Sequence, residues 1–232
     1  MIKIENVVLP STQQWEAIIR GMRNPMNSWE NSDSGWEPQF DTVQGPVAGE
    51  FIIGPNDYAL MKNLRNAGTD HRKFMRMITV HLDITAPLYW WKEFDTYKIG
   101  TVASSCSTMH KIAAKEFTLD DFSHEHLFHN VNDTEMWLDI DFFNVLDNTI
   151  FYLNKARELY LKTKGKKYWW QMIQLLPSSY NQRRTVMLNY EVLADIYKSR
   201  RHHKLDCWHT FCDWIESLPY SELITGKEHE VE

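Results

Sequence analysis

The hydrophobic pattern changes its period along the chain, and this change limits the possible folds more than any other feature of the sequence. Residues 3–9 and 74–84 alternate apolar with polar side chains, as half-buried strands do. In the second half, apolar residues recur three and four positions apart, which is typical of helices with one buried face. Strands early and helices late in one chain predict an α+β fold.

Start and stop signals give the boundaries of the expected helices. The runs Pro10-Ser-Thr and Gly54-Pro-Asn-Asp each precede a helix, and Asn132 is followed by Glu135 at the spacing of an N-cap with its reciprocal carboxylate. Glycines at 68 and 165 are expected stops. We expect helices over residues 12–22, 57–66, 88–96, 132–164, 168–176, 180–201 and 204–218.

The segment from Asn24 to Gly49 interrupts this pattern, because it is rich in Gly, Pro, Asn and Ser and carries Trp29 and Trp36. Long stretches without regular structure are uncommon inside a compact domain. We therefore expect either a functional loop or an insertion here. Residues 1–225 contain no internal repeat and predict a single domain, and the polar tail over 226–232 is expected to fray.

Composition excludes several classes of protein. A net charge of −6 counts against nucleic acid as a partner, since contacts to a duplex need a basic face. The longest apolar stretch, residues 142–153, contains Asn144, Asp147 and Asn148, so no membrane span is expected. The first residues lack an apolar signal region, and three cysteines cannot all pair within one chain. These features predict a cytoplasmic protein with reduced thiols.

Patterns for metal and phosphate-loop chemistry are missing. His124, His126 and His129 are close in sequence, and His203 lies four residues before Cys207. Neither His-Glu-x-x-His nor Cys-x-x-Cys occurs, however, so we expect these histidines to lie at surfaces and to hold no metal. The glycine-rich loops of P-loop and Rossmann proteins do not occur either.

Asn189 and Arg200 are eleven residues apart in an expected helix, which is close to three full turns. They therefore share one side of that helix, about 16 Å apart, with Leu193, Ile196 and Tyr197 between them. Such a pair could bind the two ends of an extended anionic ligand, since the arginine fork grips phosphate through two hydrogen bonds. Alternatively, Arg200 is a cation that the helix dipole favours at a C-terminus.

Two blocks of the sequence resemble the flavin-dependent thymidylate synthases. The first runs from Asn66 to Phe94 and carries Asn-Ala-Gly-Thr-Asp-His, then Ile-Thr-Val-His and Ala-Pro-Leu-Tyr-Trp-Trp. The second contains the Leu-Pro pair at 176–177, followed by Asn189, Leu193 and Arg200, and then Trp-Ile-Glu-Ser-Leu-Pro at 214–219. The likeness covers about residues 55–218, with the blocks in the family's order.

The resemblance implies a central sheet flanked by long helices, assembled as a homotetramer whose sites are shared between subunits. It implies FAD as cofactor, a deoxyuridine nucleotide as substrate, and reduced folate and NADPH as co-substrates. The flavin carries the hydride chemistry in that family, so catalytic side chains stay unassigned. By the same resemblance, Arg200, Glu93, Cys106 and Ser107 would bind the nucleotide, and Tyr97, Lys98, Ile99, Asn189 and Asp195 would bind the cofactor.

The chain departs from that family in its arginine-rich signature motif. Positions of functional charged or aromatic residues are occupied here by Thr96, Tyr97, Ala103, Ser104, Thr108 and Met109. Lys98 replaces one arginine of the motif, Glu93 replaces a glutamine, and Glu191 replaces a further arginine. Each lost charge-assisted hydrogen bond is expected to weaken nucleotide binding by about 1.5–3 kcal/mol.

Three functions stay open at the level of sequence. The first is reductive methylation of dUMP to dTMP, or a related flavin-dependent modification of a nucleotide. The second is a catalytically inactive paralogue that keeps the fold for ligand binding or assembly. The third sets the resemblance aside and interprets the chain as an interaction module, because aromatic residues form 13% of it and aromatics are enriched at interfaces.

Overall fold

The computed structural model describes residues 2–41, 45–128, 131–132 and 139–227 of the 232-residue chain. The chain forms two compact units. Unit 1 comprises Met1–Ile4, Ile84–Thr96 and Ser104–Thr185, and unit 2 comprises Glu5–Asp83, Tyr97–Ala103 and Val186–Glu232. No helix among the described residues is long and apolar enough to cross a bilayer.

A four-stranded sheet has the strand order β1-β4-β8-β5. Its strands are β1 (Lys3–Val8), β4 (Thr79–Pro87), β8 (Asn181–Asn189) and β5 (Val102–Ser105). Alternate residues of β4, from Val80 to Ala86, are buried, which confirms the period-two pattern seen in the sequence. Helices together with this sheet confirm the α+β class.

Two boundaries of the expected elements are wrong at this sheet. The strand predicted over 74–84 begins only at Thr79, after the short 3₁₀ helix η3 (Lys73–Arg76), and it continues to Pro87. Residues 181–189, predicted as the first half of a helix, form strand β8 instead. Gln182, Val186 and Leu188 are buried there at even-numbered positions. The pairing of β8 with β4 on one side and β5 on the other therefore prevails over a weak helical spacing.

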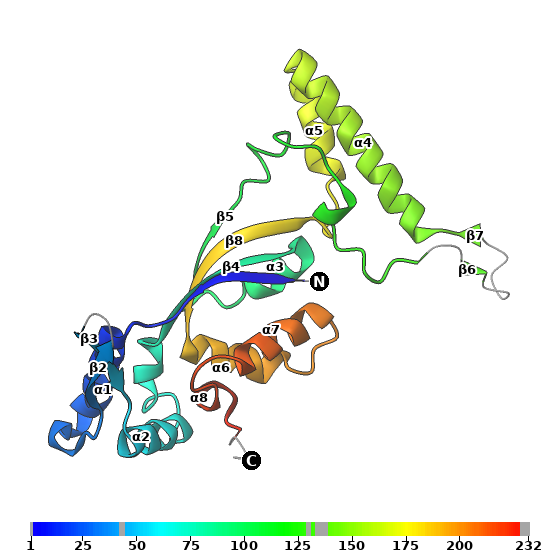
Figure 1. The fold of residues 1–232 in the computed structure, drawn as a ribbon. Coiled ribbons are helices and arrows are strands. Elements are labelled where there is room, and N and C mark those ends of the chain that lie inside the picture. The colour runs from blue at the N-terminus through cyan, green and yellow to red at the C-terminus, as the bar shows by residue number, and fades with distance from the viewer. Residues whose placement is uncertain (1, 42–44, 129–130, 133–138, 228–232) are drawn as a thin grey trace. The chain divides into compact units, whose positions relative to one another are not determined.

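In unit 2, helix α6 (Tyr190–Arg200) lies beside α7 (Asp206–Glu216) and α8 (Glu222–Thr225) (Figure 1). Their shared core contains the fully buried side chains Tyr190, Leu193, Trp208, Phe211 and Ile215. The Tyr190 hydroxyl donates a hydrogen bond of 2.6 Å to the Pro219 carbonyl, so this large buried ring leaves its polar atom satisfied. The predicted helix over 204–218 is thus confirmed within two residues of its ends.

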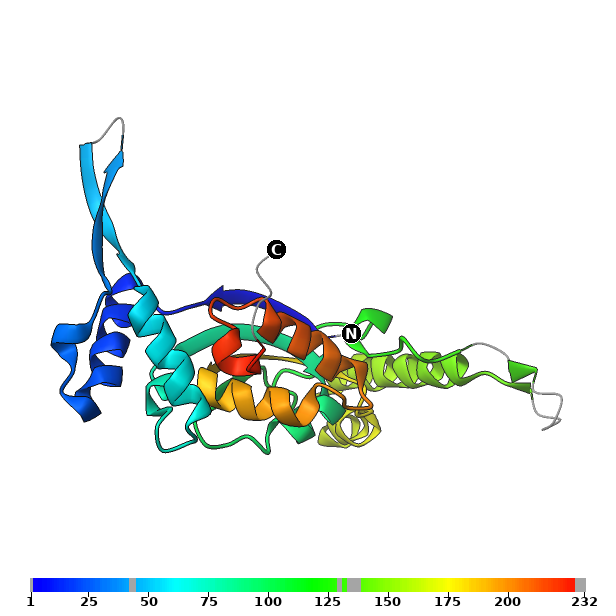
Figure 2. The same ribbon diagram turned by 90° about the horizontal axis from the view of Figure 1, so that it is seen from below.

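The segment over 24–49 is not the structureless loop that its composition suggests. Two 3₁₀ turns, η1 (Asn24–Met26) and η2 (Trp29–Asn31), lead into the antiparallel hairpin of β2 (Gly35–Asp41) and β3 (Gly45–Ile52) (Figure 2). Trp36 pairs with Phe51 across the strands, and their rings pack edge to face at 5.8 Å. Pro38 lies where the register shifts between Glu37 and Gln39, so the missing N–H falls at a bulge.

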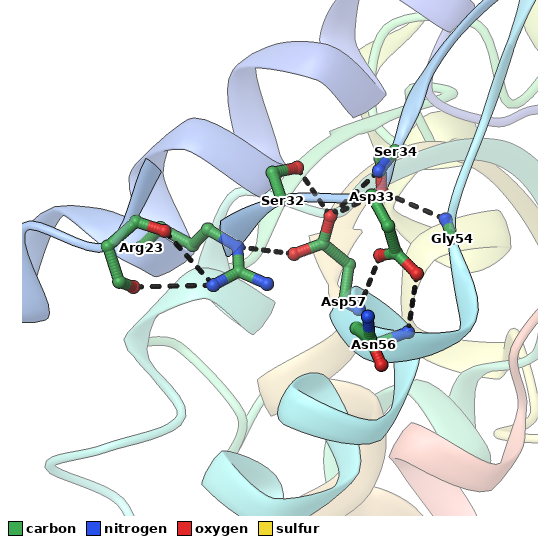
Figure 3. Close-up of polar contacts among 8 residues, drawn as sticks. Arg23, Ser32, Asp33, Ser34, Gly54, Asn56 and Asp57 are labelled. Atoms are coloured by element: carbon green, nitrogen blue, oxygen red, sulfur yellow. Dashed lines mark hydrogen bonds and ion pairs between the residues drawn. The ribbon is translucent and has the colours of Figure 1, made fainter. Parts of the chain in front are cut away.

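Figure 3 shows the polar cluster that joins the base of this hairpin to helices α1 (Thr12–Arg23) and α2 (Pro55–Asn66). Arg23 and Asp57 form an ion pair of 2.5 Å, with side chains 6% and 0% exposed. Asp57 also accepts hydrogen bonds of 2.6 Å from the hydroxyls of Ser32 and Ser34. Asp33 accepts from the backbone N–H groups of Asn56 and Asp57 at 2.8 and 3.0 Å and thereby caps α2.

Unit 1 contains α3 (Leu88–Phe94), α4 (Phe142–Thr163) and α5 (Lys166–Leu175), and α4 packs along α5 (Figure 1). Helix α4 begins ten residues later than predicted, because Asp141 is its N-cap and accepts from the Asn144 N–H at 2.9 Å. Asn132 lies instead in the short strand β6 (Val131–Asn132), paired with β7 (Asp139–Ile140), and Glu135 lies outside the described residues. The stop at Gly165 is confirmed, since it separates α4 from α5.

Candidate functional site

Helix α6 begins at Asn189, which the sequence analysis assigned to cofactor binding. Asn189 is buried, and its side-chain oxygen accepts a hydrogen bond of 3.0 Å from the Val192 N–H, as an N-cap does. Gly100 lies directly against this cap with φ of +82°. A Cβ at Gly100 would come within 2.9 Å of both the Asn189 amide nitrogen and a Val192 methyl group. Only glycine therefore lets the preceding loop approach the start of α6.

Arg200 ends the same helix and contacts the other end of the same loop. Its Nε donates a hydrogen bond of 2.9 Å to the Tyr97 hydroxyl. The guanidinium carbon lies 4.9 Å from the centroid of the Trp208 ring and 5.7 Å from that of Tyr97. These aromatic faces attract the cation and fix its orientation. The loop from Tyr97 to Gly100 thus follows α6 from its last residue to its N-cap.

The surface of α6 between these two residues is packed, not open. Leu193 and Ile196 are completely buried, and Tyr197 is 7% exposed. An extended ligand therefore cannot lie along that face, and this part of the two-ended interpretation is wrong. The position of Arg200 at the last residue of α6 also agrees with the helix-dipole alternative.

The middle of the loop is exposed. Lys98 lies at the surface, and the Ile99 side chain is 93% exposed. Beyond Gly100, the Thr101 hydroxyl is buried and has no hydrogen-bond partner among the residues that the structure describes. A buried hydroxyl without a partner is uncommon, which marks this loop as a place where a ligand group would be accommodated.

Asp195, the last cofactor residue suggested by resemblance, lies on α6 between Asn189 and Arg200 but on another side of the helix. Its carboxylate forms an ion pair of 3.2 Å with Arg72 and is 60% exposed. It lines a cavity of about 500 Å³ to which neither Tyr97 nor Arg200 contributes. The structure therefore brings together Tyr97, Asn189 and Arg200 but does not join Asp195 to them.

Glu191, which occupies a position where the resemblance implies an arginine, is buried and paired twice. It accepts hydrogen bonds from Arg72 at 3.4 Å and from Arg76, whose Nε approaches it most closely. Hydrogen bonding to Glu191, followed by its charge, raises the pKa of Arg76. The two arginines were not found from the sequence, because they lie 119 and 115 residues away from Glu191.

Glu93, Cys106 and Ser107 belong to unit 1. Glu93 is half-buried on α3, and Cys106 is exposed in the loop that follows β5. The Cys106 backbone pairs with β8, since its N–H donates to the Arg183 carbonyl at 2.9 Å and its carbonyl accepts from Gln182 at 2.8 Å. The Ser107 hydroxyl accepts from the His110 N–H at 2.9 Å and so closes a turn.

An arginine that the sequence analysis did not assign stabilises this part of unit 1. Arg184 stacks 4.1 Å over the Trp91 ring and forms an ion pair of 2.7 Å with Asp95. It also donates to the Gln182 side chain at 3.0 Å, which in turn holds the Cys106 carbonyl. Because Asp95 neutralises it, Arg184 acts here as a positioning residue for the Cys106 loop. Within the described ranges, no group of three or more His, Cys, Asp or Glu side chains could hold a metal ion.

Comparisons with known proteins support the fold but identify no relative by sequence. No family model matches the sequence, and no curated protein matches it. Among solved structures, Thymidylate Synthase X (ThyX) from Helicobacter pylori, crystallised with FAD and dUMP, superposes with a TM-score of 0.62 at 16% identity, covering 97% of each chain. A second crystal structure of that enzyme with FAD and dUMP gives 0.63 at 15% identity, over 97% of this chain and 98% of that one.

A UMP/dUMP methylase, PolB from Streptomyces cacaoi bound with 5-Br dUMP, has the same fold. Its TM-score is 0.56 at 12% identity, over 97% of this chain and 95% of that one. These likenesses confirm that the chain has the fold of the flavin-dependent thymidylate synthases, as the two sequence blocks predicted. At such low identity, fold likeness alone does not establish a reaction.

Proposed function

We propose that this protein is a flavin-dependent nucleotide-modifying enzyme that reductively methylates dUMP to dTMP or carries out a related modification. The observation that carries the proposal is the loop from Tyr97 to Gly100, which contacts both Arg200 and Asn189 at the two ends of α6. Support comes from the fold, since structural neighbours covering 97% of this chain were crystallised with FAD and dUMP or with 5-Br dUMP.

The residues of the loop fit one edge of a bound FAD. Ile99 offers apolar surface, Lys98 offers a cation for a phosphate, and the Thr101 hydroxyl lacks a partner among the described residues. We assign Tyr97, Lys98, Ile99 and Asn189 to holding the cofactor, whereas Asp195 is engaged by Arg72 elsewhere. When bound, FAD would supply the hydride, with reduced folate as the one-carbon donor and NADPH as the reductant. The side chains named here bind and orient; no proton transfer is assigned to them.

The nucleotide is assigned to Arg200 of unit 2. Glu93, Cys106 and Ser107, which the resemblance also selects for the nucleotide, belong to unit 1. Arg200 suits a phosphate because Tyr97 and Trp208 hold its planar fork in one orientation before any ligand arrives. Preorganised cations lose less entropy on binding than mobile ones. The loss of the other signature arginines makes this residue the main expected source of phosphate affinity.

The visible absorption spectrum tests the proposal. We expect the purified protein to carry FAD or to take it up from solution, and we expect dUMP to perturb the flavin band. Lys98→Glu should weaken FAD binding at least tenfold, because a charge-assisted hydrogen bond contributes about 1.5–3 kcal/mol. Lys92→Glu, an equal charge change at an exposed position of α3, is the control. A colourless protein that takes up no added FAD would refute the proposal.

A second candidate, a catalytically inactive paralogue, is favoured by the ion pairs of Glu191. Arg72 and Arg76 both form ion pairs with the Glu191 carboxylate in the first turn of α6, at a position where the resemblance implies an arginine. In that case FAD and dUMP would bind in the spectral experiment, but no dTMP would form when reduced folate and NADPH are supplied. Formation of dTMP in the same mixture would eliminate this candidate.

We further propose that the protein assembles as a homotetramer through α4. Val145, Tyr152 and Leu159 are seven residues apart on this helix and are 63%, 60% and 42% exposed, while Leu153 on its other side is fully buried. An apolar stripe of this spacing is typical of helices that pack against a partner helix. A second copy of the chain supplies such a helix directly.

Native mass measurement tests this assembly. We expect the unmodified protein to have four times the mass of one chain. Tyr152→Glu should dissociate it, because a charge would be buried in an apolar helix contact. Leu161→Glu, which also replaces an exposed apolar residue of α4 but lies off the stripe, should leave the tetramer intact. A monomeric unmodified protein would contradict the assembly and favour a simple interaction module.

A further inference from the structure

A cavity of about 500 Å³ in unit 2 is separate from the site around Arg200. Its walls come from the end of α2, the segment before η3, α6 with the two residues that follow it, and the end of α8 with Lys227. Pockets that hold small organic ligands have volumes of about 300–1,000 Å³. The cavity is therefore large enough for a ligand of nucleotide size.

The walls of this cavity are strongly cationic, although the chain as a whole carries a charge of −6. Among the described residues, five cations line it against one carboxylate, Asp195; the cations are Arg65, Arg72, Lys198, Arg201 and Lys227. Three of the five are neutralised by the chain itself: Arg72 by Glu191 and Asp195, Arg201 by Asp213 and Glu216, and Lys227 by Glu216. Arg65 and Lys198 form no ion pair within the part of the chain that the structure describes.

Within the described ranges, the groups that hold Arg65 in the cavity wall are neutral. Its Nε and Nη2 donate to the carbonyls of Leu223 and Ile224, each at 3.2 Å, and Nη1 donates to the Asn66 side chain at 2.9 Å. Gly226, with φ of +71°, lets the backbone pass the guanidinium, because a Cβ there would lie 2.5 Å from Nη2. Burial, and then the charge of Arg72, lower the pKa of Arg65.

The remaining lining residues are three with apolar surface and the polar His202 and Thr225. Ala194, Ile224 and the Tyr197 ring line the cavity between the cations. A ligand that matches this surface combines a multiply charged anionic group with an organic body. An inorganic anion would pair with the cations only. A phosphate ester or a pyrophosphate ester would pair with the cations and also contact the apolar side chains.

We infer that this cavity binds a phosphorylated small molecule, with Arg65 and Lys198 as the cations that contact its phosphate groups. The site lies outside the one assigned to FAD and dUMP, since no residue given those roles other than Asp195 lines it. It would take a free metabolite that carries a phosphate or pyrophosphate group, in addition to the cofactor and substrate of the proposed reaction.

Titration calorimetry with inorganic pyrophosphate, and then with ADP as an organic pyrophosphate, tests this inference on the full chain. We expect saturable binding of both at low ionic strength, with affinity that falls as salt is added. ADP should bind at least as tightly as pyrophosphate, because it also contacts the apolar side chains. Lys198→Glu should weaken both at least tenfold. Lys198 is exposed and forms no ion pair within the described residues, so this variant should fold normally.

Lys204→Glu is the matched control, because it makes the same charge change at an exposed position that does not line the cavity. Arg65→Gln, which keeps hydrogen-bonding groups but removes the charge, is a second variant and should weaken pyrophosphate by a similar factor. Absence of saturable binding, or equal affinity of the Lys198→Glu and Lys204→Glu proteins, would overturn the inference. FAD uptake by the same two variants separates this outcome from a failure of the proposed function, since neither lysine is assigned to the flavin.

Discussion

Replacing Asp57 by asparagine should lower the free energy of unfolding by about 3–5 kcal/mol, which is the usual effect of breaking a buried ion pair on one side. Arg23 would remain only 6% exposed and would lose its carboxylate, while the hydroxyls of Ser32 and Ser34 would lose their charged acceptor. Urea unfolding followed by circular dichroism measures the change. The control is Glu158→Gln, because the exposed Lys155–Glu158 pair should contribute about 0–1 kcal/mol.

The Asp57 carboxylate should also make the free energy of unfolding depend on pH. Burial raises the pKa of Asp57, but hydrogen bonds from Ser32, Ser34 and Arg23, with the charge of Arg23, outweigh it and leave that pKa below its usual value. The folded form therefore releases the proton more readily than the unfolded form does. The resulting stabilisation is present above the unfolded pKa and is lost as the pH falls through the folded one. Asp57→Asn should flatten this part of the curve; an unchanged curve would contradict the role given to the pair.

Local signals in the sequence were sufficient wherever a boundary depends on nearby residues. Helix α1 begins where Ser11 predicted, because the Ser11 hydroxyl and the Gln14 side chain cap each other's backbone groups within one turn. The stop after α2 depends equally on local chemistry, since Gly68 has φ of +110°. Such interactions are complete within four residues and need no tertiary context.

Boundaries that depend on distant partners were missed. Strand β8 obtains its hydrogen bonds from β4 and β5, which lie far away in sequence, so its weak alternation resembled a helix. The hairpin over Gly35–Ile52 contains glycines and prolines that disfavour strands, and cross-strand pairing such as Trp36 with Phe51 stabilises it nevertheless. The buried Arg23–Asp57 pair joins residues 34 positions apart and left no pattern in the sequence.

The candidate site was predictable to a similar extent. Resemblance selected Tyr97, Asn189 and Arg200, and the structure brings these three to one loop and one helix. It did not select Arg65, whose position in the cavity depends on carbonyls 158 and 159 residues away. A cation whose partners are backbone carbonyls has no charge complement in the sequence, so no pairing rule could have found it.

Replacing Arg200 by alanine should weaken dUMP binding about 10- to 150-fold, which corresponds to the loss of a charge-assisted contact of roughly 1.5–3 kcal/mol. Titration of the protein with dUMP, followed by calorimetry or by the flavin band, measures the effect. Arg20→Ala on α1 is the control, because its side chain is 62% exposed and lies in no assigned site. FAD binding should fall less than dUMP binding, since the cofactor is assigned to the loop, which Arg200 contacts through Tyr97.

A merely structural role for Arg200 would produce a different result. The guanidinium packs on Trp208 and binds the Tyr97 hydroxyl, so its removal also disturbs the loop and should lower the unfolding temperature. Tyr97→Phe separates the two effects, because it removes only the hydrogen bond that orients the fork. If Arg200 binds phosphate, the Tyr97→Phe protein should retain most of its stability and bind dUMP severalfold more weakly. The Arg200→Lys protein should bind dUMP more weakly still, since lysine lacks the planar fork. Equal dUMP affinity in the alanine and lysine variants and the unmodified protein would show that Arg200 serves only the end of α6.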